Sequence, residues 1–463
     1  MTASPSPALP FGNVMDAIGN TPMIEVSKLD RGPCKLFLKL ENQNPGGSIK
    51  DRIGRSMVLA AERDGKLKPG GTIIEATAGN TGLGLALAAV QRGYRMVLVV
   101  PDKMAQEKIF HLKALGADVR LTRSDVGKGH PAYYQDMAER LAADNGWFYA
   151  NQFGNRANPQ AHYEATGPEI LQQLDGKLDA MVCGVGSAGT ISGLSRYFAE
   201  TSFGTEMVLA DPEGSILANY IATGEVSSDS GSWIVEGIGE DFIPPIADFS
   251  RVRRAYSIPD REALETARAL LRLEGILAGS SSGTLIAAAL RYCREQTEPK
   301  RVCTFVCDSG NKYLSKMFND FWMLDQGFLT RPAKGDLRDL ISRRHENRET
   351  VIVSPEDALS TALARMKLYD ISQLPVLDGA GRVVGIIDEE DILFPLMDAA
   401  SDFTATVSDI MTTGLETIAP DRPISDLKAI FKQGHVAIVT EGERFLGLIT
   451  RMDLLTYLRR KQA

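Results

Sequence analysis

The chain has few cysteines and histidines, and neither residue type is grouped in a metal-binding pattern. It holds five of each in 463 residues, and no two cysteines form C-x-x-C. The cysteines are Cys34, Cys183, Cys293, Cys303 and Cys307. Structural zinc sites and redox dithiols need closely spaced ligands of these types. We therefore expect reduced thiols, as in a cytosolic protein, and no metal site.

The sequence also lacks long apolar runs and an excess of basic charge. No apolar run reaches the roughly 18 residues of a membrane-spanning helix, and residues 1–12 lack the basic and apolar segments of a signal peptide. The formal net charge is −8, with scattered lysines and arginines. These features predict a cytoplasmic protein whose main partners are neither nucleic acids nor membranes.

A regular alternation of strand-like and helix-like segments runs from about residue 35 to residue 320. Short β-branched runs predict buried strands, for example 72–77, 94–100, 206–211 and 300–307. Longer amphipathic or alanine-rich segments between them predict helices, for example 49–65, 82–93 and 261–275. This alternation predicts an α/β fold with mainly parallel sheets covered by helices on both faces.

The C-terminal part of the chain repeats itself. Residues 354–393 are echoed by residues 419–455, and both copies are typical of turn, helix, strand, strand and helix start. Such self-similarity predicts two copies of one small unit that bury their faces against each other. We predict a catalytic domain at 1–328, a charged linker at 329–345, and repeats at 346–400 and 401–463.

A glycine-rich loop follows the strand-like run 178–183. Gly184, Gly186 and Gly189 fit G-x-G-x-x-G, and Asp211 lies about 20 positions further on, as in dinucleotide-binding sites. Backbone N–H groups at a helix start bind the phosphate of a dinucleotide and that of another cofactor by the same physics. The loop alone leaves open an NAD oxidoreductase and an enzyme with another phosphate cofactor.

Lys50 stands in the first turn of the helix predicted after a Pro-Gly-Gly turn, within LENQNPGGSIKDR (40–52). The positive end of a helix depresses the pKa of an amine there. This placement suits a lysine that forms a Schiff base with an aldehyde cofactor. The simpler alternative is a solvated lysine.

Two further clusters of small polar residues begin predicted helices. EATAGNTG (75–82) predicts a receptor for a carboxylate, although an ordinary helix cap would also account for Thr81. EGILAGSSSG (274–283) places three serines between glycines, and we expect at least one of them to cap its helix.

These motifs, together and in this order, resemble the β-family of pyridoxal-phosphate enzymes (fold type II), which includes cysteine synthase and cystathionine β-synthase. The resemblance covers about residues 11–328 and implies two open, twisted, mainly parallel sheets flanked by helices. It implies that Lys50 binds pyridoxal phosphate and acts as the catalytic base at Cα. Asn80 would bond the ring oxygen of the cofactor, and Ser281 would face the pyridine nitrogen.

The resemblance also assigns the remaining contacts. The cofactor contacts are Lys50, Asn80, Gly186, Ser187, Ala188, Gly189, Thr190 and Ser281. The substrate contacts are Thr77, Ala78, Gly79, Thr81, Gln152 and Gly237. Among these contacts, two residues depart from the family pattern, because Ala188 replaces a usual glycine and Ala78 replaces a frequent serine.

Residues 235–244, VEGIGEDFIP, resemble cystathionine β-synthase more than cysteine synthase, with Glu240 in place of a tyrosine. The resemblance implies condensation of L-serine, or of an O-activated serine, with L-homocysteine to give cystathionine in transsulfuration, and allows hydrogen sulfide production. The rival within the same class is cysteine synthesis from O-acetylserine and sulfide. The rival from another class is an adenosyl-ligand sensor with a relic catalytic domain.

The C-terminal repeats resemble a tandem pair of CBS domains, a Bateman module, which implies an adenosyl ligand. Thr450 and Asp453 match the residues that hold ribose hydroxyls in such sites, and Asp388 and Asp391 match them in part. The alternative is a module that only mediates assembly. The resemblance implies a homodimer or homotetramer, and no haem is expected because no histidine precedes Cys34.

Overall fold

The computed structural model describes residues 10–462 except 78, 103, 105, 128, 228–229 and 398–401. The chain divides between Phe318 and Asn319 into two compact units. Within the described ranges, no helix combines the length and apolarity needed to cross a bilayer.

The first unit contains a six-stranded sheet whose strands are parallel, apart from its first edge strand. The spatial order is β1 (Met23–Glu25), β2 (Lys35–Leu40), β10 (Arg301–Val306), β7 (Ala180–Gly184), β8 (Glu206–Pro212) and β9 (Val252–Ile258). The strands β7, β8 and β10 are almost entirely buried, because helices cover both faces of a parallel sheet.

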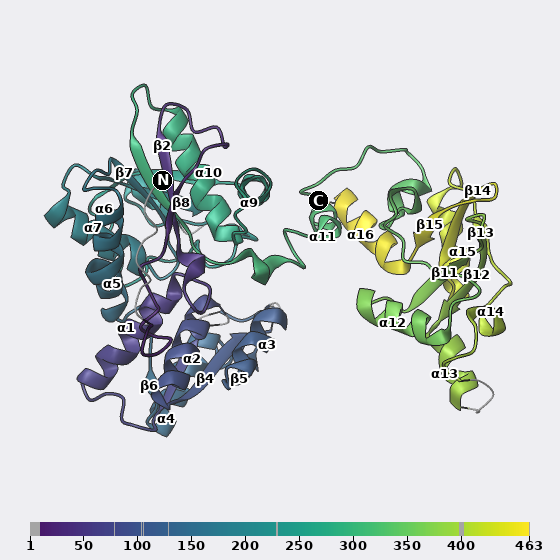
Figure 1. The fold of residues 1–463 in the computed structure, drawn as a ribbon, viewed down its shortest axis with the longest axis horizontal. Helices are drawn as coiled ribbons and strands as arrows, with labels where there is room; N and C mark the ends of the chain where they lie inside the picture. The colour runs from purple at the N-terminus through teal and green to yellow at the C-terminus, as the bar shows by residue number, and fades with distance from the viewer. Residues whose placement is uncertain are drawn as a thin grey trace. The chain divides into compact units, whose positions relative to one another are not determined.

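A second sheet of four parallel strands completes the first unit. Its order is β5 (Asp118–Thr122), β4 (Arg95–Pro101), β3 (Thr72–Ala76) and β6 (Phe148–Tyr149). Figure 1 shows helices α2 (Asn80–Arg92) and α4 (Tyr134–Asn145) beside this sheet. Helix α1 (Lys50–Arg63) packs on α2 so closely that a Cβ on Gly54 would collide with the backbone at Gly84.

The remaining helices of the first unit are α3 (Gln106–Ala114), α5 (Ala157–Ala161), a π-helical turn (His162–Thr166), α6 (Gly167–Gln173), α7 (Gly189–Thr201), α8 (Leu217–Thr223), α9 (Asp260–Glu274) and α10 (Ser280–Arg294). Most of them follow strands, as the alternating sequence pattern predicts, whereas the π-helical turn and α6 continue from α5, and α10 follows α9. Helix α10 is almost completely buried and packs against α9. The predicted α/β class with mainly parallel sheets is confirmed.

The second unit contains two copies of one arrangement of helix, antiparallel strand pair and helix. The first copy is α12 (Leu359–Tyr369), β11 (Gln373–Leu377), β12 (Val383–Asp388) and α13 (Glu389–Met397). The second is α15 (Leu427–Lys432), β14 (Ala437–Glu441), β15 (Arg444–Ile449) and α16 (Arg451–Gln462). Short elements flank them: α11 (Asp320–Asp325), α14 (Val407–Ile410) and β13 (Thr417–Ile418).

The two copies bury apolar side chains against each other. Leu377 of the first copy clusters with Ile438 and Phe445 of the second, which confirms the expectation of packed repeats. Leu337 and Leu340, inside the segment predicted as a linker, are buried in the core of the second copy. The domain boundaries drawn from the sequence stay predictions.

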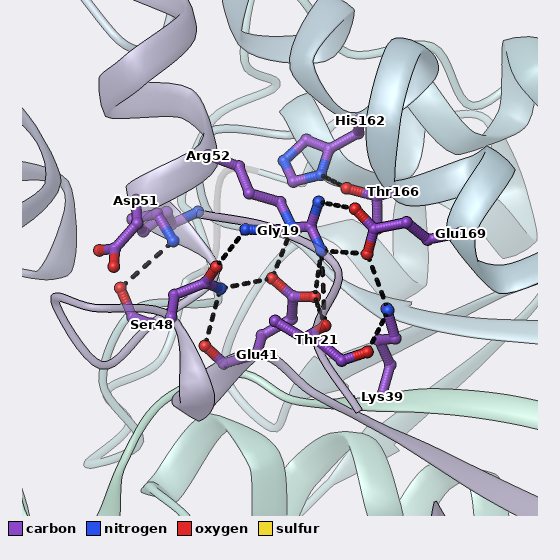
Figure 2. A network of polar contacts seen from close by, with 12 residues as sticks. Gly19, Thr21, Lys39, Glu41, Ser48, Asp51, Arg52, His162, Thr166 and Glu169 are labelled. Carbon is purple, nitrogen blue, oxygen red and sulfur yellow. Dashed lines mark hydrogen bonds and ion pairs between the residues drawn. The ribbon is translucent and has the colours of Figure 1, made fainter. Parts of the chain in front are cut away.

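A buried ionic network anchors the first turn of α1. The Arg52 guanidinium donates to both Glu41 oxygens at 2.7 and 2.8 Å, and to both Glu169 oxygens at 2.7 Å (Figure 2). Lys39, on β2, reaches Glu169 at 2.8 Å, and Thr21 donates to Glu41. Burial alone would raise the pKa of Glu41, but the charge of Arg52 holds it below its usual value. The network therefore joins α1, β2 and α6 through paired, ionised groups.

We predict that Glu41→Gln lowers the free energy of unfolding of the first unit by about 3–5 kcal/mol, because it leaves part of the buried Arg52 charge uncompensated. Glu62→Gln is the matched control, since Glu62 pairs with a half-exposed Arg92. The control should cost less than about 1 kcal/mol. Urea unfolding followed by circular dichroism measures both, and equal losses would contradict the structural role of the network.

Candidate active site

A cavity of about 820 Å³ in the first unit collects residues from separate parts of the chain. The predicted site residues that line it are Lys50, Thr77, Gly79, Asn80, Thr81, Gln152, Gly186, Ser187, Ala188, Gly189, Thr190, Gly237 and Ser281. Ala78 lies outside the described residues. The chain therefore brings the described members of the predicted set together, and their individual roles stay predictions.

Lys50 begins α1 and is half-buried at the cavity, which argues against the alternative of a freely solvated lysine. Burial lowers the pKa of its amine, while nearby Cys307, Glu240 and Asp308 oppose this shift. The loop before it is fixed by backbone hydrogen bonds from Ile49 to Cys307 at 2.8 Å and from Ser309 to Gly47 at 3.2 Å. A lowered pKa makes more of the amine available as a nucleophile and as a base at neutral pH.

The glycine loop forms a cradle for an anion at the start of α7. A Cβ on Gly186 would lie 2.6 Å from the carbonyl oxygen of Gly237, and a Cβ on Gly189 would collide with Asn158. No side chain caps α7, so its first N–H groups are available to a ligand. Ala188 has φ of 68°, in the left-handed region. Glycine adopts this conformation without steric cost, so the alanine at this position predicts local strain.

The loop is braced by residues that the sequence analysis did not select as site residues. Asn158 donates to the backbone oxygen of Gln152 at 2.8 Å and to Ser187 Oγ at 2.9 Å, and its own Oδ1 is buried without a hydrogen bond among the described residues. His162 Nε2 lies 3.2 Å from Thr190 Oγ1. Burial lowers the pKa of His162 well below its usual value, so this ring is neutral.

The start of α2 offers backbone donors to a second anion. Gly79 N donates to Thr77 Oγ1 at 3.1 Å, and Thr81 Oγ1 donates to Gln152 Oε1 at 2.7 Å. Thr81 is therefore not a helix cap, and no described side chain caps α2. The open N–H groups at this helix start can receive a carboxylate.

Asn80 is held by two charged groups that sequence reasoning missed. Its Nδ2 donates to Asp308 Oδ2 at 2.8 Å, and Lys312 Nζ donates to its Oδ1 at 2.6 Å. Tyr313 also donates to Asp308 Oδ2, at 2.9 Å. A polar segment directly after a buried strand was the available signal for this cluster.

The expectation that a serine caps α10 is wrong. Ser280 Oγ accepts from Glu236 N at 3.1 Å, and Ser282 Oγ accepts from Cys307 N at 2.9 Å. The helix begins after Gly279 without a side-chain cap, because these hydroxyls bind neighbouring loops instead. Ser281 lines the cavity.

Carboxylates from the segment 235–244 also line the cavity. Glu236 forms ion pairs with Lys108 and, at 2.7 Å, with Lys316. Burial raises the pKa of Glu240 to about 9, and the charge of Asp241 adds to this, while Lys50 opposes it. Glu240 is therefore protonated at neutral pH.

The remaining sequence candidates have structural explanations. Asp211 Oδ2 accepts from Ala218 N at 2.8 Å and so holds the start of α8, which accounts for the acidic residue of the dinucleotide-like pattern. The five cysteines are unpaired. Among the described residues, no three histidine, cysteine or acidic side chains gather as a metal site.

In the second unit, the predicted ligand residues form reciprocal hydrogen bonds at helix starts. Asp453 Oδ2 accepts from Thr450 Oγ1 at 2.6 Å and from Thr450 N at 2.7 Å, and Ser342 donates to Asp453 Oδ1. In the first copy, Asp388 N donates to Asp391 Oδ2 at 3.0 Å. The two copies thus share one local geometry, with Asp388 in the place of Thr450.

Comparison with known proteins identifies the family of each unit. The family model described as pyridoxal-phosphate dependent enzyme matches residues 14–308, and the CBS domain model matches 338–398 and 407–460. A cystathionine beta-synthase of Dictyostelium discoideum is 34% identical, covering 97% of this chain and 93% of that protein. The cystathionine beta-synthase of Saccharomyces cerevisiae is also 34% identical, covering 99% of this chain and all of that protein.

The crystal structure of an O-acetylserine dependent cystathionine beta-synthase from Helicobacter pylori matches with a TM-score of 0.61 and 36% identity, over 67% of this chain and 99% of that one. These matches show pyridoxal phosphate, and not a dinucleotide, as the cofactor of the family. Because both units match and the curated relatives contain both, the chain belongs to the cystathionine beta-synthase family of pyridoxal-phosphate dependent enzymes.

Proposed function

We propose that this chain catalyses a β-replacement that joins L-serine, or an O-activated serine, to L-homocysteine and yields cystathionine, with hydrogen sulfide production as a related reaction. The observation that carries the proposal is one cavity that is lined by Lys50 and by the starts of two helices with open N–H groups. One start suits a cofactor phosphate, and the other suits the carboxylate of an amino acid.

Pyridoxal phosphate fits the residues present. The loop 186–190 has no space for side chains at Gly186 and Gly189, so a phosphate can approach the backbone N–H groups. Asn80 would hold the ring oxygen, and Ser281 would face the ring nitrogen without keeping it protonated. When bound, the cofactor supplies an electron sink for the negative charge that develops at Cα.

The chain itself supplies binding and proton transfer. Thr77, Thr81 and the open backbone N–H groups at the start of α2 receive the substrate carboxylate and orient the amino acid. The Lys50 amine takes the proton from Cα and later returns it, which its lowered pKa favours. At Cβ, the bond to the oxygen leaving group breaks and a bond to the homocysteine sulfur forms, with release of water or, from O-acetylserine, acetate.

Glu240 replaces a tyrosine of the family pattern, yet it retains an O–H donor. Because burial keeps its carboxyl protonated at neutral pH, it adds no negative charge to the cavity that would repel an incoming thiolate. Its backbone is fixed, since Glu240 N donates to Ser215 Oγ and Ile216 N donates to Glu240 O, both at 3.1 Å. A protonated carboxyl can therefore take over a hydrogen bond that a tyrosine hydroxyl would donate.

The second unit is part of the proposal as a regulatory module for an adenosyl ligand. The hydrogen-bonded pair Thr450 and Asp453 supports this role, since it fixes a carboxylate beside the strand end. We also propose a cytoplasmic homodimer or homotetramer. The unpaired state of the five thiols supports a reducing compartment.

The proposed reaction is tested by product analysis with the purified, cofactor-loaded protein. We expect cystathionine from L-serine and L-homocysteine, and a loss of turnover of at least about 100-fold in Lys50→Ala, because proton transfer at Cα is removed. Lys66→Ala, at an exposed lysine beyond the end of α1, is the control. Cysteine from O-acetylserine and sulfide, without cystathionine from either donor, would favour the rival cysteine synthase.

We predict that Glu240→Gln raises the melting temperature at pH 8.5 by at least about 2–4 °C, and changes it much less at pH 5. The folded protein retains a proton on Glu240 between its ordinary pKa of 4.5 and about 9, so stability falls as pH rises through this window. A glutamine side chain does not titrate, so the variant does not lose stability over this pH range. The exposed Glu225→Gln serves as control, and a gain that does not depend on pH would refute the assigned protonation state.

We predict that Asp453→Ala weakens binding of S-adenosylmethionine or AMP to the full chain by at least about tenfold, because a ribose loses its carboxylate partner. Asp391→Ala, at the partly matching site, should have the smaller effect. Isothermal titration calorimetry measures both. If the unmodified protein binds neither ligand, the regulatory role is wrong and the alternative, a module that only mediates assembly, is favoured.

A further inference from the structure

The Asn80 amide lies between groups of opposite charge. Lys312 Nζ contacts Oδ1 at 2.6 Å, and Asp308 Oδ2 accepts from Nδ2 at 2.8 Å. Asn80 lines the cavity, whereas Asp308 and Lys312 lie behind it and are absent from the described lining residues. These two residues therefore act on the cavity through Asn80.

This arrangement allows only one orientation of the amide. An ammonium group has donors and no acceptor, and an ionised carboxylate has acceptors and no donor. A flipped Asn80 would place NH₂ against the ammonium and oxygen against the carboxylate. In the favoured orientation, one N–H of Nδ2 is used by Asp308, and the second stays available to a ligand.

Lys312 also contacts the loop that leads to Lys50. Its ammonium lies 3.3 Å from the carbonyl oxygen of Gly46 and 3.4 Å from that of Gly47. One cation thus joins the start of α2 to the loop before α1. Burial lowers the pKa of Lys312, with Asp308 and Asp51 opposing this shift and Lys108 adding to it; His111 is a further titratable neighbour.

Hydrogen bonds from three other residues fix the side chain and backbone of Asp308. Its Oδ2 accepts from Tyr313 as well as from Asn80, and Gly279 N donates to its backbone oxygen at 3.0 Å. Its Oδ1 is buried without a hydrogen bond in the described part of the chain. A buried carboxylate is costly unless it is compensated, and Lys312 is the cation bonded to the same amide.

We propose that Lys312 and Asp308 are positioning residues that lock the Asn80 amide with one N–H directed to the ring oxygen of pyridoxal phosphate, and that the Lys312 charge favours the anionic form of that oxygen. This inference rests on the proposed role of Asn80 in the proposed function. Lys312 and Asp308 touch neither cofactor nor substrate in this assignment.

The test compares Lys312→Met, Lys312→Arg and Asp308→Asn in the full-length protein. The readouts are the dissociation constant for pyridoxal phosphate, from titration of the cofactor-free protein, and the pH midpoint of the visible absorption change of the bound cofactor. Lys300→Met is the matched control, because Lys300 is half-buried and donates to Tyr292 at 3.1 Å, outside the cavity lining.

We expect Lys312→Met and Asp308→Asn each to weaken cofactor binding about tenfold, since the amide is no longer locked. The pH midpoint should rise in Lys312→Met, which loses a positive charge, and fall in Asp308→Asn, which loses a negative one. Lys312→Arg should restore the midpoint towards that of the unmodified protein. A merely structural tie between α1 and α2 would not move the midpoint in opposite directions.

Unchanged binding and midpoints in both charge variants, in a protein that still makes cystathionine, would overturn the positioning role and leave the proposed function standing. Opposite midpoint shifts in a protein that makes no cystathionine would support the positioning role and overturn the proposed function. If Lys312→Met does not fold, Asp308→Asn, which preserves side-chain shape, decides the question by the same two readouts.

Discussion

The first unit depends on a buried guanidinium that two carboxylates share. Arg52 fixes the first turn of α1 against β2 and α6, and that turn begins with Lys50. A flexible lysine can serve as both nucleophile and base only if its backbone is held in place. The ionic network on one side of α1 and the backbone bonds of the loop 46–49 on the other provide this. Buried ions thus fix the position of the lysine that we propose as the reactive group, where apolar packing alone would leave the register of α1 less restricted.

The chemistry of the cavity follows from helix ends left without side-chain caps. Both α2 and α7 begin with open N–H groups, and each points to one anionic part of the expected ligands. Small residues at these starts, such as Gly186, let other groups approach the backbone closely. The nearby serines and threonines form hydrogen bonds with other loops and do not cap the helices. An open helix end is a cost in stability that a bound anion can offset.

Charge in the cavity is controlled by burial as much as by residue type. Glu240 stays neutral because its surroundings disfavour ionisation, while Lys50 is shifted in the opposite direction. Behind the cavity wall, Asp308 and Lys312 bracket the single amide of Asn80. Glu41 and Glu240 of the same unit thus have pKa values shifted in opposite directions, because Arg52 compensates the buried charge of Glu41, whereas burial disfavours a charge on Glu240.

The sequence by itself determined the α/β class, the repeated C-terminal unit, the cofactor family and a group of residues that line one cavity, because strand-helix alternation and short motifs at helix starts are local signals. It did not reveal Arg52 with Glu41 and Glu169, whose partners lie 11 and 117 positions away. Nor did it reveal that Asn80 meets Asp308 and Lys312, or that Leu337 belongs to the core of the second repeat. Tertiary structure decided these points, since a charged or apolar residue acquires its partner, its pKa and its role only when distant segments are brought into contact.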